Sequence, residues 1–220
     1  MPADRPVPPA FVLAHTRPVR PSLVPEVELL VAADVVALWE AMEEQHGSAL
    51  AEPPFWAAAW PGGQALARYV LDHPELVAGR SVLDLGSGSG LVAVAAGLAG
   101  AAHVVGSEID PFGVTAIGLN AELNGVPPIP VVGDVLGGGP PDVDVVLAGD
   151  VCYDRVMSER VLPYLFAARA HGAEVLLGDP GRQYVPRERL SAVATFDVAE
   201  TEPAPHPPTQ VRRATVWRLP

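Results

Sequence analysis

The stretch SVLDLGSGSGLVAVAAGLAG, residues 81–100, decides the fold. Its first five residues are typical of a short buried strand, its glycine-rich centre of a loop, and its apolar, alanine-rich remainder of a helix. A strand that passes through glycines directly into a helix leaves free N–H groups at the helix start and lets a ligand approach the main chain. The stretch therefore predicts an α/β fold with a ligand site at this loop.

Strands and helices continue to alternate after this stretch. Apolar segments typical of strands lie at 102–110, 129–134, 143–150 and 173–180, and helical patterns lie at 112–124 and 158–169. This alternation predicts a mostly parallel sheet covered by helices on both faces. After a short predicted helix near 186–191, the strand candidates 194–202 and 210–220 can pair as an antiparallel hairpin at the sheet edge.

The chain before this region is less regular. The first 25 residues contain seven prolines and predict an extended arm. Beyond them we expect a strand at 25–32, a helix at 34–44 that Gly47 ends, and a helix that ends near Asp72. Three aromatic residues are crowded just before this last helix, so the segment reads as an accessory helical and aromatic layer.

A chain of 220 residues fits one domain better than two. We expect a proline-rich arm over residues 1–25 and a single domain over 26–220. Within that domain, residues 26–78 form the N-terminal layer and residues 79–220 the Rossmann-like core.

The charge composition excludes several functions. The net charge is -12, and all 14 basic residues are Arg because the sequence has no Lys. A lysine Schiff base, a lysine nucleophile and the lysine of a phosphate-binding P-loop are therefore excluded. The acidic balance disfavours a nucleic-acid binder and suits a basic partner.

The cysteine content and the hydropathy pattern indicate where in the cell we expect the protein. Cys152 is the single cysteine, and no Cys or His residues stand at zinc-binding spacing, so we expect a metal-free protein of the cytoplasm. Residues 85–107 carry no formal charge, but their glycines suit a strand, loop and helix better than a membrane span. We expect neither a membrane nor a nucleic-acid partner.

The glycine loop has an unusual spacing. Gly86, Gly88 and Gly90 follow Asp84 at the strand end, whereas a dinucleotide fingerprint needs a sixth-position glycine where Leu91 stands. A glycine loop alone is weak support, since many glycine-rich turns are only structural.

Two carboxylates strengthen the prediction. Glu108 stands twenty residues after Gly88, at the end of the next strand, where a carboxylate can accept both hydroxyls of a ribose. Asp134 ends the third strand, where an adenine amino group would lie, although it could also be a solvated turn residue. Together with the loop, these positions predict a nucleoside site at the strand ends.

These motifs resemble a known enzyme class. VLDLGSGSG (82–90), GSEID (106–110) and VVGD (131–134) are similar to the ordered motifs of S-adenosylmethionine-dependent methyltransferases of the seven-strand fold. That class has five parallel strands plus a terminal antiparallel pair, in agreement with the order read above. The resemblance implies S-adenosylmethionine as cofactor, S-adenosylhomocysteine as product, and no metal.

A closer resemblance spans roughly residues 23–182. PFWAAAWPGGQALARYVLD, NAELNG, GDVCYD and GDPGR are similar to the lysine methyltransferases that modify the β subunit of electron transfer flavoprotein, especially their bacterial relatives. In that family the W-P-G-G segment covers the cofactor, which implies contacts from Trp60 and Gly63, although Trp60 could instead be a core aromatic. The expected cofactor residues are Trp60, Gly63, Asp84, Gly86, Ser87, Gly88, Gly90, Glu108 and Asp134.

The family's Asp/Asn-x-Phe-Tyr motif stands here as Asp150, Val151, Cys152 and Tyr153. We expect Asp150 to orient the substrate amine and Tyr153 to bound its channel, as the two catalytic residues. Cys152 at the Phe position implies that part of an aromatic wall is lost, and a buried packing role suits this cysteine better than nucleophilic chemistry. Asp150 could alternatively cap the next helix.

The leading prediction is a protein-lysine N-methyltransferase that acts on the electron transfer flavoprotein β subunit or a similar lysine-bearing protein. A second interpretation keeps the fold and cofactor but takes a small amine or a ribosomal protein as substrate. A third is a non-catalytic nucleoside-binding module, and a nicotinamide-dependent enzyme is a fourth.

Overall fold

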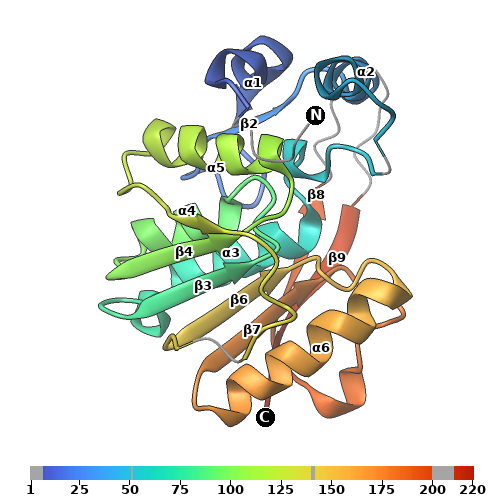
Figure 1. Ribbon diagram of the computed structural model, residues 1–220. Helices are drawn as coiled ribbons and strands as arrows, with labels where there is room; N and C mark the ends of the chain where they lie inside the picture. Colours follow the sequence, from blue (N-terminus) through green and yellow to red (C-terminus); the bar gives the residue numbers. More distant parts are fainter. Residues whose placement is uncertain (1–6, 51, 140–141, 200–210) are drawn as a thin grey trace.

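The computed structural model describes residues 7–50, 52–139, 142–199 and 211–220 (Figure 1). Its centre is a seven-stranded sheet in the order β5-β4-β3-β6-β7-β9-β8. The strands are β3 (Ser81–Leu85), β4 (His103–Ser107), β5 (Val131–Val132), β6 (Val145–Gly149), β7 (Glu174–Asp179), β8 (Ser191–Ala199) and β9 (Val211–Arg218). The first five run parallel, and β9 runs antiparallel to both β7 and β8. The predicted parallel sheet with an antiparallel edge pair is confirmed.

Helices cover both faces of this sheet because its strands are apolar on both sides. One face packs against α3 (Pro61–Asp72), α4 (Leu91–Leu98) and α5 (Pro111–Leu123), and the other against α6 (Arg155–Ala170). In β3, Val82 belongs to the first apolar core, whereas Leu83 and Leu85 belong to the second. The two cores leave the carboxyl ends of the strands available for a site.

A close backbone contact sets the position of α3. A Cβ atom added at Gly62 would collide with the carbonyl of Gly178 at the end of β7, and one added at Gly178 would collide with Gly62. Only glycine at both positions permits this approach. The first turn of α3 therefore lies directly against the strand ends that carry Asp150.

The N-terminal layer differs from the extended arm expected over residues 1–25. Its elements are α1 (Pro9–His15), β1 (Thr16–Val19), β2 (Leu29–Ala32), α2 (Val35–His46) and the short 3-10 helix η1 (Phe55–Ala57). β1 and β2 pair antiparallel as a separate hairpin, which crosses the expected boundary after residue 25. Proline is compatible with this structure because Pro9 begins α1, where its missing N–H costs no hydrogen bond. Residues 1–6 lie outside the described residues.

The C-terminal region follows the expected order with shorter elements. The helix expected near 186–191 is a 3-10 turn, η3 (Arg187–Arg189), and the strand candidate 194–202 is observed as β8, from residue 191 to 199. Residues 200–210 lie outside the described part. Among the described residues, no helix has the length and apolar character needed to cross a membrane.

Candidate active site

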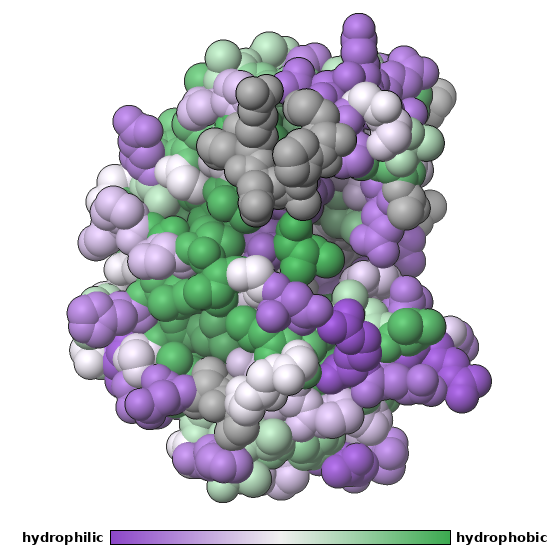
Figure 2. All heavy atoms as spheres, viewed as in Figure 1, coloured by the Kyte–Doolittle hydropathy of each residue, from purple (hydrophilic) through white to green (hydrophobic). Residues whose placement is uncertain are grey.

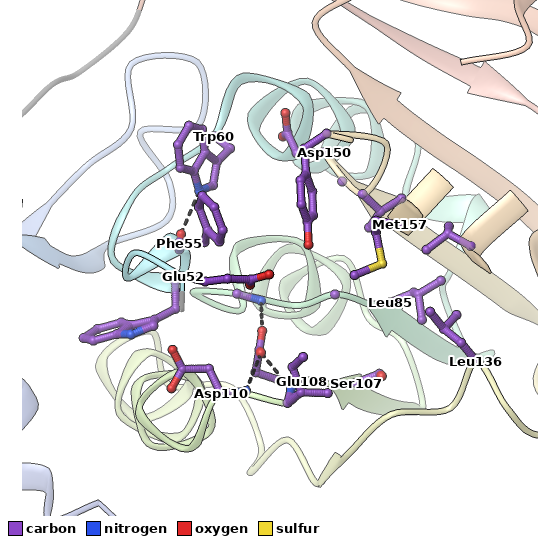
Figure 3. Close-up of a pocket in the computed structure, with 18 of the residues that line it drawn as sticks. Glu52, Phe55, Trp60, Leu85, Ser107, Glu108, Asp110, Leu136, Asp150 and Met157 are labelled. Atoms are coloured by element: carbon purple, nitrogen blue, oxygen red, sulfur yellow. Dashed lines mark hydrogen bonds between the residues drawn. The ribbon is translucent and has the colours of Figure 1, made fainter. Parts of the chain in front are cut away.

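A cavity of about 240 Å³ opens at the carboxyl ends of β3, β4 and β6 (Figure 3). Its walls come from the segment before α3, the glycine loop, the ends of β4 and β5, and the segments after β6 and β7. Figure 2 shows apolar side chains gathered across the middle of the face seen in Figure 1. Of the expected site residues, seven line the cavity: Trp60, Gly86, Gly88, Glu108, Asp134, Asp150 and Tyr153.

The glycine loop is shaped by main-chain conformation. Gly86 has φ 67° and Gly88 has φ 53°, which L-residues with side chains rarely adopt, and both residues line the cavity. Ser87 and Gly90 lie behind the wall: the Ser87 N–H donates to the Ser107 carbonyl at 2.9 Å, and Gly90 packs toward α5. The loop therefore exposes main-chain atoms of Gly86 and Gly88 to the cavity, while Ser87 and Gly90 contact the protein behind it.

Glu108 is held by backbone donors. One carboxylate oxygen accepts from the Gly88 N–H at 2.8 Å, and the other accepts from Ile109 and Asp110 at 2.7 and 2.8 Å. Burial raises the pKa of Glu108 above its usual value, and these N–H donors oppose that rise. The carboxylate is thus fixed at the edge of the cavity, as Figure 3 shows.

Asp134, two residues after β5, also lines the cavity. Arg160 on α6 donates to one of its oxygens at 2.6 Å, and the Leu136 N–H donates to the other at 2.9 Å. The Arg160 hydrogen bond lowers the pKa of Asp134. Ile109, which is 66% exposed, and Leu136 add apolar surface to the same cavity.

Asp84 does not reach the cavity. Its side chain is buried inside β3 and accepts from the Ala93 N–H of α4 at 3.1 Å. Burial raises the pKa of Asp84 to about 7. The expected cofactor contact is therefore replaced in the structure by a bond that ties β3 to α4.

Asp150 lies at the opposite end of the cavity, held by two donors. The Gly63 N–H, in the first turn of α3, donates to one oxygen at 2.6 Å, and Arg182 donates to the other at 2.6 Å. Burial raises the pKa of Asp150 to about 6, and Arg182 opposes that rise. Asp150 is the one non-glycine residue with positive φ among the described residues, at 60°, and such strain is characteristic of functional sites.

The structure gives Gly63 a different role from the cofactor contact expected for it. Gly63 does not line the cavity and instead orients Asp150 through its N–H. The cap of α6 is Asp154, whose side chain accepts from Met157 at 2.7 Å, so Asp150 is not the cap of the next helix.

Three aromatic rings line the mouth beside Asp150. The Phe55 ring lies 6.0 Å from Trp60 and 5.6 Å from Tyr153, measured between centroids. Trp60 is 40% exposed and donates from Nε1 to the Phe55 carbonyl at 2.7 Å. It is therefore a wall residue rather than a core aromatic.

The expected loss of an aromatic wall at Cys152 is wrong. Its side chain is fully buried in the core between the sheet and α6, and it does not line the cavity. Burial raises the pKa of this thiol to about 11, which makes it a poor nucleophile. A Phe at this position would face the core, so the change alters packing rather than the substrate wall.

The cavity residues that the sequence did not predict as site residues include Glu52, Phe55, Arg160 and Arg182. Arg182 is the last residue of GDPGR, one of the segments that resemble the family, but the resemblance assigned it no role. Its role follows from its contact with Asp150, 32 residues away in the sequence. Figure 3 shows Glu52 between Phe55 and Glu108.

Within the described residues, no cluster of three or more His, Cys, Asp or Glu side chains is arranged to hold a metal ion.

The sheet order and the strand-end cavity define a seven-strand methyltransferase fold. A precorrin-6y C5,15-methyltransferase from Geobacter metallireducens aligns with a TM-score of 0.51 and 16% identity over 70% of this chain and 87% of its own. A magnesium protoporphyrin IX methyltransferase from Synechocystis, solved with S-adenosylhomocysteine, aligns with a TM-score of 0.50 over 72% and 82%. Both alignments show that the chain has the fold of the class I methyltransferases.

Sequence relatives define the family. The electron transfer flavoprotein β subunit lysine methyltransferase of Danio rerio is 42% identical over 175 residues, which cover 78% of this chain and 67% of the fish protein. The human protein of that name is 41% identical over 164 residues, covering 73% and 61%. This chain belongs to the family of electron transfer flavoprotein β subunit lysine methyltransferases.

A second group is similar over less of the chain. The Ribosomal protein L11 methyltransferase (PrmA) family matches residues 65–151. The ribosomal protein L11 methyltransferase of Geobacter sulfurreducens is 36% identical over 135 residues, covering 60% of this chain and 44% of that protein.

Proposed function

We propose that this protein transfers a methyl group from S-adenosylmethionine to a lysine side chain of an electron transfer flavoprotein β subunit. The observation that carries the proposal is the pairing of a backbone-held Glu108 with an Arg-held Asp150 at opposite ends of one cavity. Membership of the lysine methyltransferase family supports a lysine as the acceptor.

The cavity fits the cofactor in chemistry. Gly86 and Gly88 leave backbone without side chains at its floor, and Glu108 offers a fixed acceptor for ribose hydroxyls. Ile109 and Leu136 provide the apolar faces that an adenine ring requires, beside the Asp134 carboxylate. S-adenosylmethionine, when bound, supplies an activated methyl group.

The other end of the cavity suits a lysine amine. Asp150 is held against free rotation by Gly63 and Arg182, so a further hydrogen bond from the amine to its carboxylate has a defined direction. A carboxylate also favours the charged ammonium, and we therefore assign Asp150 an orienting role and let the proton leave to water. Phe55, Trp60 and Tyr153 would enclose the aliphatic part of the lysine.

The test is methylation of a purified flavoprotein with tritiated S-adenosylmethionine. We expect label on the β subunit, with mass spectrometry placing it on lysine. Because the enzyme contains no Lys, any labelled lysine belongs to the partner. An enzyme that binds S-adenosylhomocysteine but leaves the β subunit unlabelled would refute the substrate while keeping the cofactor.

A second candidate substrate is ribosomal protein L11, because the similarity to L11 methyltransferases covers the cofactor loop and Asp150. The same assay with both proteins present separates the two. Label on L11 alone would replace the first proposal.

A further inference from the structure

Asn120 on α5 is a fully buried amide that contacts two separate parts of the chain. Its Nδ2 donates to the Ser89 carbonyl in the glycine loop at 2.8 Å. Its Oδ1 accepts from the Leu30 N–H of β2 at 2.9 Å. One side chain therefore joins the loop to the N-terminal hairpin.

Asn124, one turn later, contacts the same hairpin but not the loop. Its Oδ1 accepts from the Glu28 N–H at 2.8 Å, and its Nδ2 donates to the Glu28 carbonyl at 2.7 Å. Residues 28 and 30 lie on the edge of β2 that faces α5, since alternate residues of a strand bond to the same side. The two amides thus replace a neighbouring strand along this edge.

The contact at Ser89 bears on the cavity because it adds to the other hydrogen bonds that hold this loop. Gly88 donates to Glu108, and Gly90 donates to the Ser87 carbonyl at 2.7 Å. Because the Ser89 carbonyl and the Gly90 N–H belong to one planar peptide unit, Asn120 adds a restraint from α5 to a unit that the loop already holds. This unit lies one residue after Gly88, which lines the cavity.

The hairpin side of Asn120 also leads to the cavity. Leu30 packs in one apolar cluster with Trp56 and Phe112, and Trp56 lines the cavity next to Phe55. The path from Ser89 through Asn120 to Leu30 and Trp56 is a continuous chain of hydrogen-bonded and packed groups. The Asn120 side chain is therefore connected both to the glycine loop and, through Leu30, to the Trp56 side of the cavity.

We propose that Asn120 is a positioning residue that holds the cofactor loop against the N-terminal hairpin. Cofactor binding at the loop then changes the environment of the Leu30 amide. This inference rests on the cofactor of the family and not on the identity of the methylated substrate. The proposed effect of Asn120 on cofactor binding is indirect, because this residue does not line the cavity.

The first test compares Asn120→Asp with Asn124→Ala. Asn120→Asp keeps an acceptor for Leu30 but replaces the donor to Ser89 by a carboxylate, so we expect S-adenosylhomocysteine affinity to fall about tenfold by calorimetry. Asn124→Ala loses its bonds to the hairpin and its Nδ2 bond to the Asn120 carbonyl, at 2.7 Å, but keeps both side-chain contacts of Asn120. We therefore expect its affinity to stay within about twofold although its Tm falls. Equal affinity losses in the two variants, or none in Asn120→Asp, would overturn the proposal.

The second test uses the unmodified protein and so does not depend on the variant folding. In a nuclear magnetic resonance titration with S-adenosylhomocysteine, the amide signals of Gly88 and Leu30 should move together with one Kd, whereas that of Glu28 should not. Movement of Gly88 without Leu30 would refute the coupling. No movement of either would refute the loop as a cofactor site as well, whatever the methylation assay gives.

Discussion

The two ends of the cavity hold their carboxylates in different ways. Glu108 is bonded to backbone N–H groups that lie 20, 1 and 2 residues away in the sequence. Asp150 is bonded to an amide 87 residues away and to a guanidinium 32 residues away. The end that we propose for the cofactor is therefore a local structure, whereas the proposed reacting end forms only when α3, β6 and the segment after β7 come together.

This difference implies that the two ends can be damaged separately. Substitutions at Glu108 should change cofactor affinity, whereas substitutions at Asp150 should change turnover with the cofactor still bound.

The largest effect is expected for Asp150→Asn. The amide keeps the shape but loses the charge, and its NH2 group must face either the Gly63 N–H or the Arg182 guanidinium, both of which donate. We expect the turnover number to fall about 100-fold or more, with S-adenosylhomocysteine affinity changed less than about threefold. Radiometric rates and calorimetry measure the two quantities. A comparable loss in both would mean that the two ends are not independent.

Glu108→Gln is the matching change at the cofactor end. Its one remaining oxygen can accept either from Gly88 or from Ile109 and Asp110, and the new NH2 group then faces the other N–H donors without accepting from them. We expect S-adenosylhomocysteine binding to weaken about 10- to 30-fold, because hydrogen bonds to a charged group contribute about 1.5–3 kcal/mol. Turnover at saturating cofactor should fall much less than in Asp150→Asn, and the reverse order would contradict the assignment.

The same difference decides what could be predicted from the sequence. The strand, glycine loop and helix at 81–98 are one continuous segment, and Glu108 follows at a fixed spacing, so this end was predicted in place. Asp150 and Tyr153 were found through the family motif. Arg182 stands in the family-like segment GDPGR, but its role could not be predicted because the contact with Asp150 forms only when the segments after β6 and β7 meet.

Two failures have a physical cause that sequence alone does not contain. Asp84 stands at the strand end like a ligand residue, but strand alternation and the path of α4 turn it inward toward Ala93. Proline content predicted an arm over residues 1–25, whereas the pairing of β1 with β2 is a tertiary contact that composition does not encode.

A smaller effect with a distinct signature is expected for Arg182→Met. Asp150 has a pKa of about 6, raised by burial and restrained by Arg182, so removal of the guanidinium should raise that pKa further. If ionised Asp150 orients the amine, activity is lost as pH falls through this pKa, and the acidic limb of the kcat/KM profile should move to higher pH. Arg182→Lys keeps the positive charge and should move the limb less. An unmoved limb in Arg182→Met would separate Asp150 ionisation from catalysis.

The smallest effect on catalysis is expected at Cys152, although it stands between Asp150 and Tyr153 in the motif. Its thiol is buried against α6 and does not touch the cavity, so Cys152→Ala should reduce the free energy of unfolding by about 1–2 kcal/mol through lost packing. Turnover and cofactor affinity should stay within about twofold at a temperature where both proteins are folded. Urea unfolding and the methylation assay check the two parts. A large loss of turnover without a loss of stability would place this side chain in the reaction after all, and would show that the reacting end extends into the core behind Asp150.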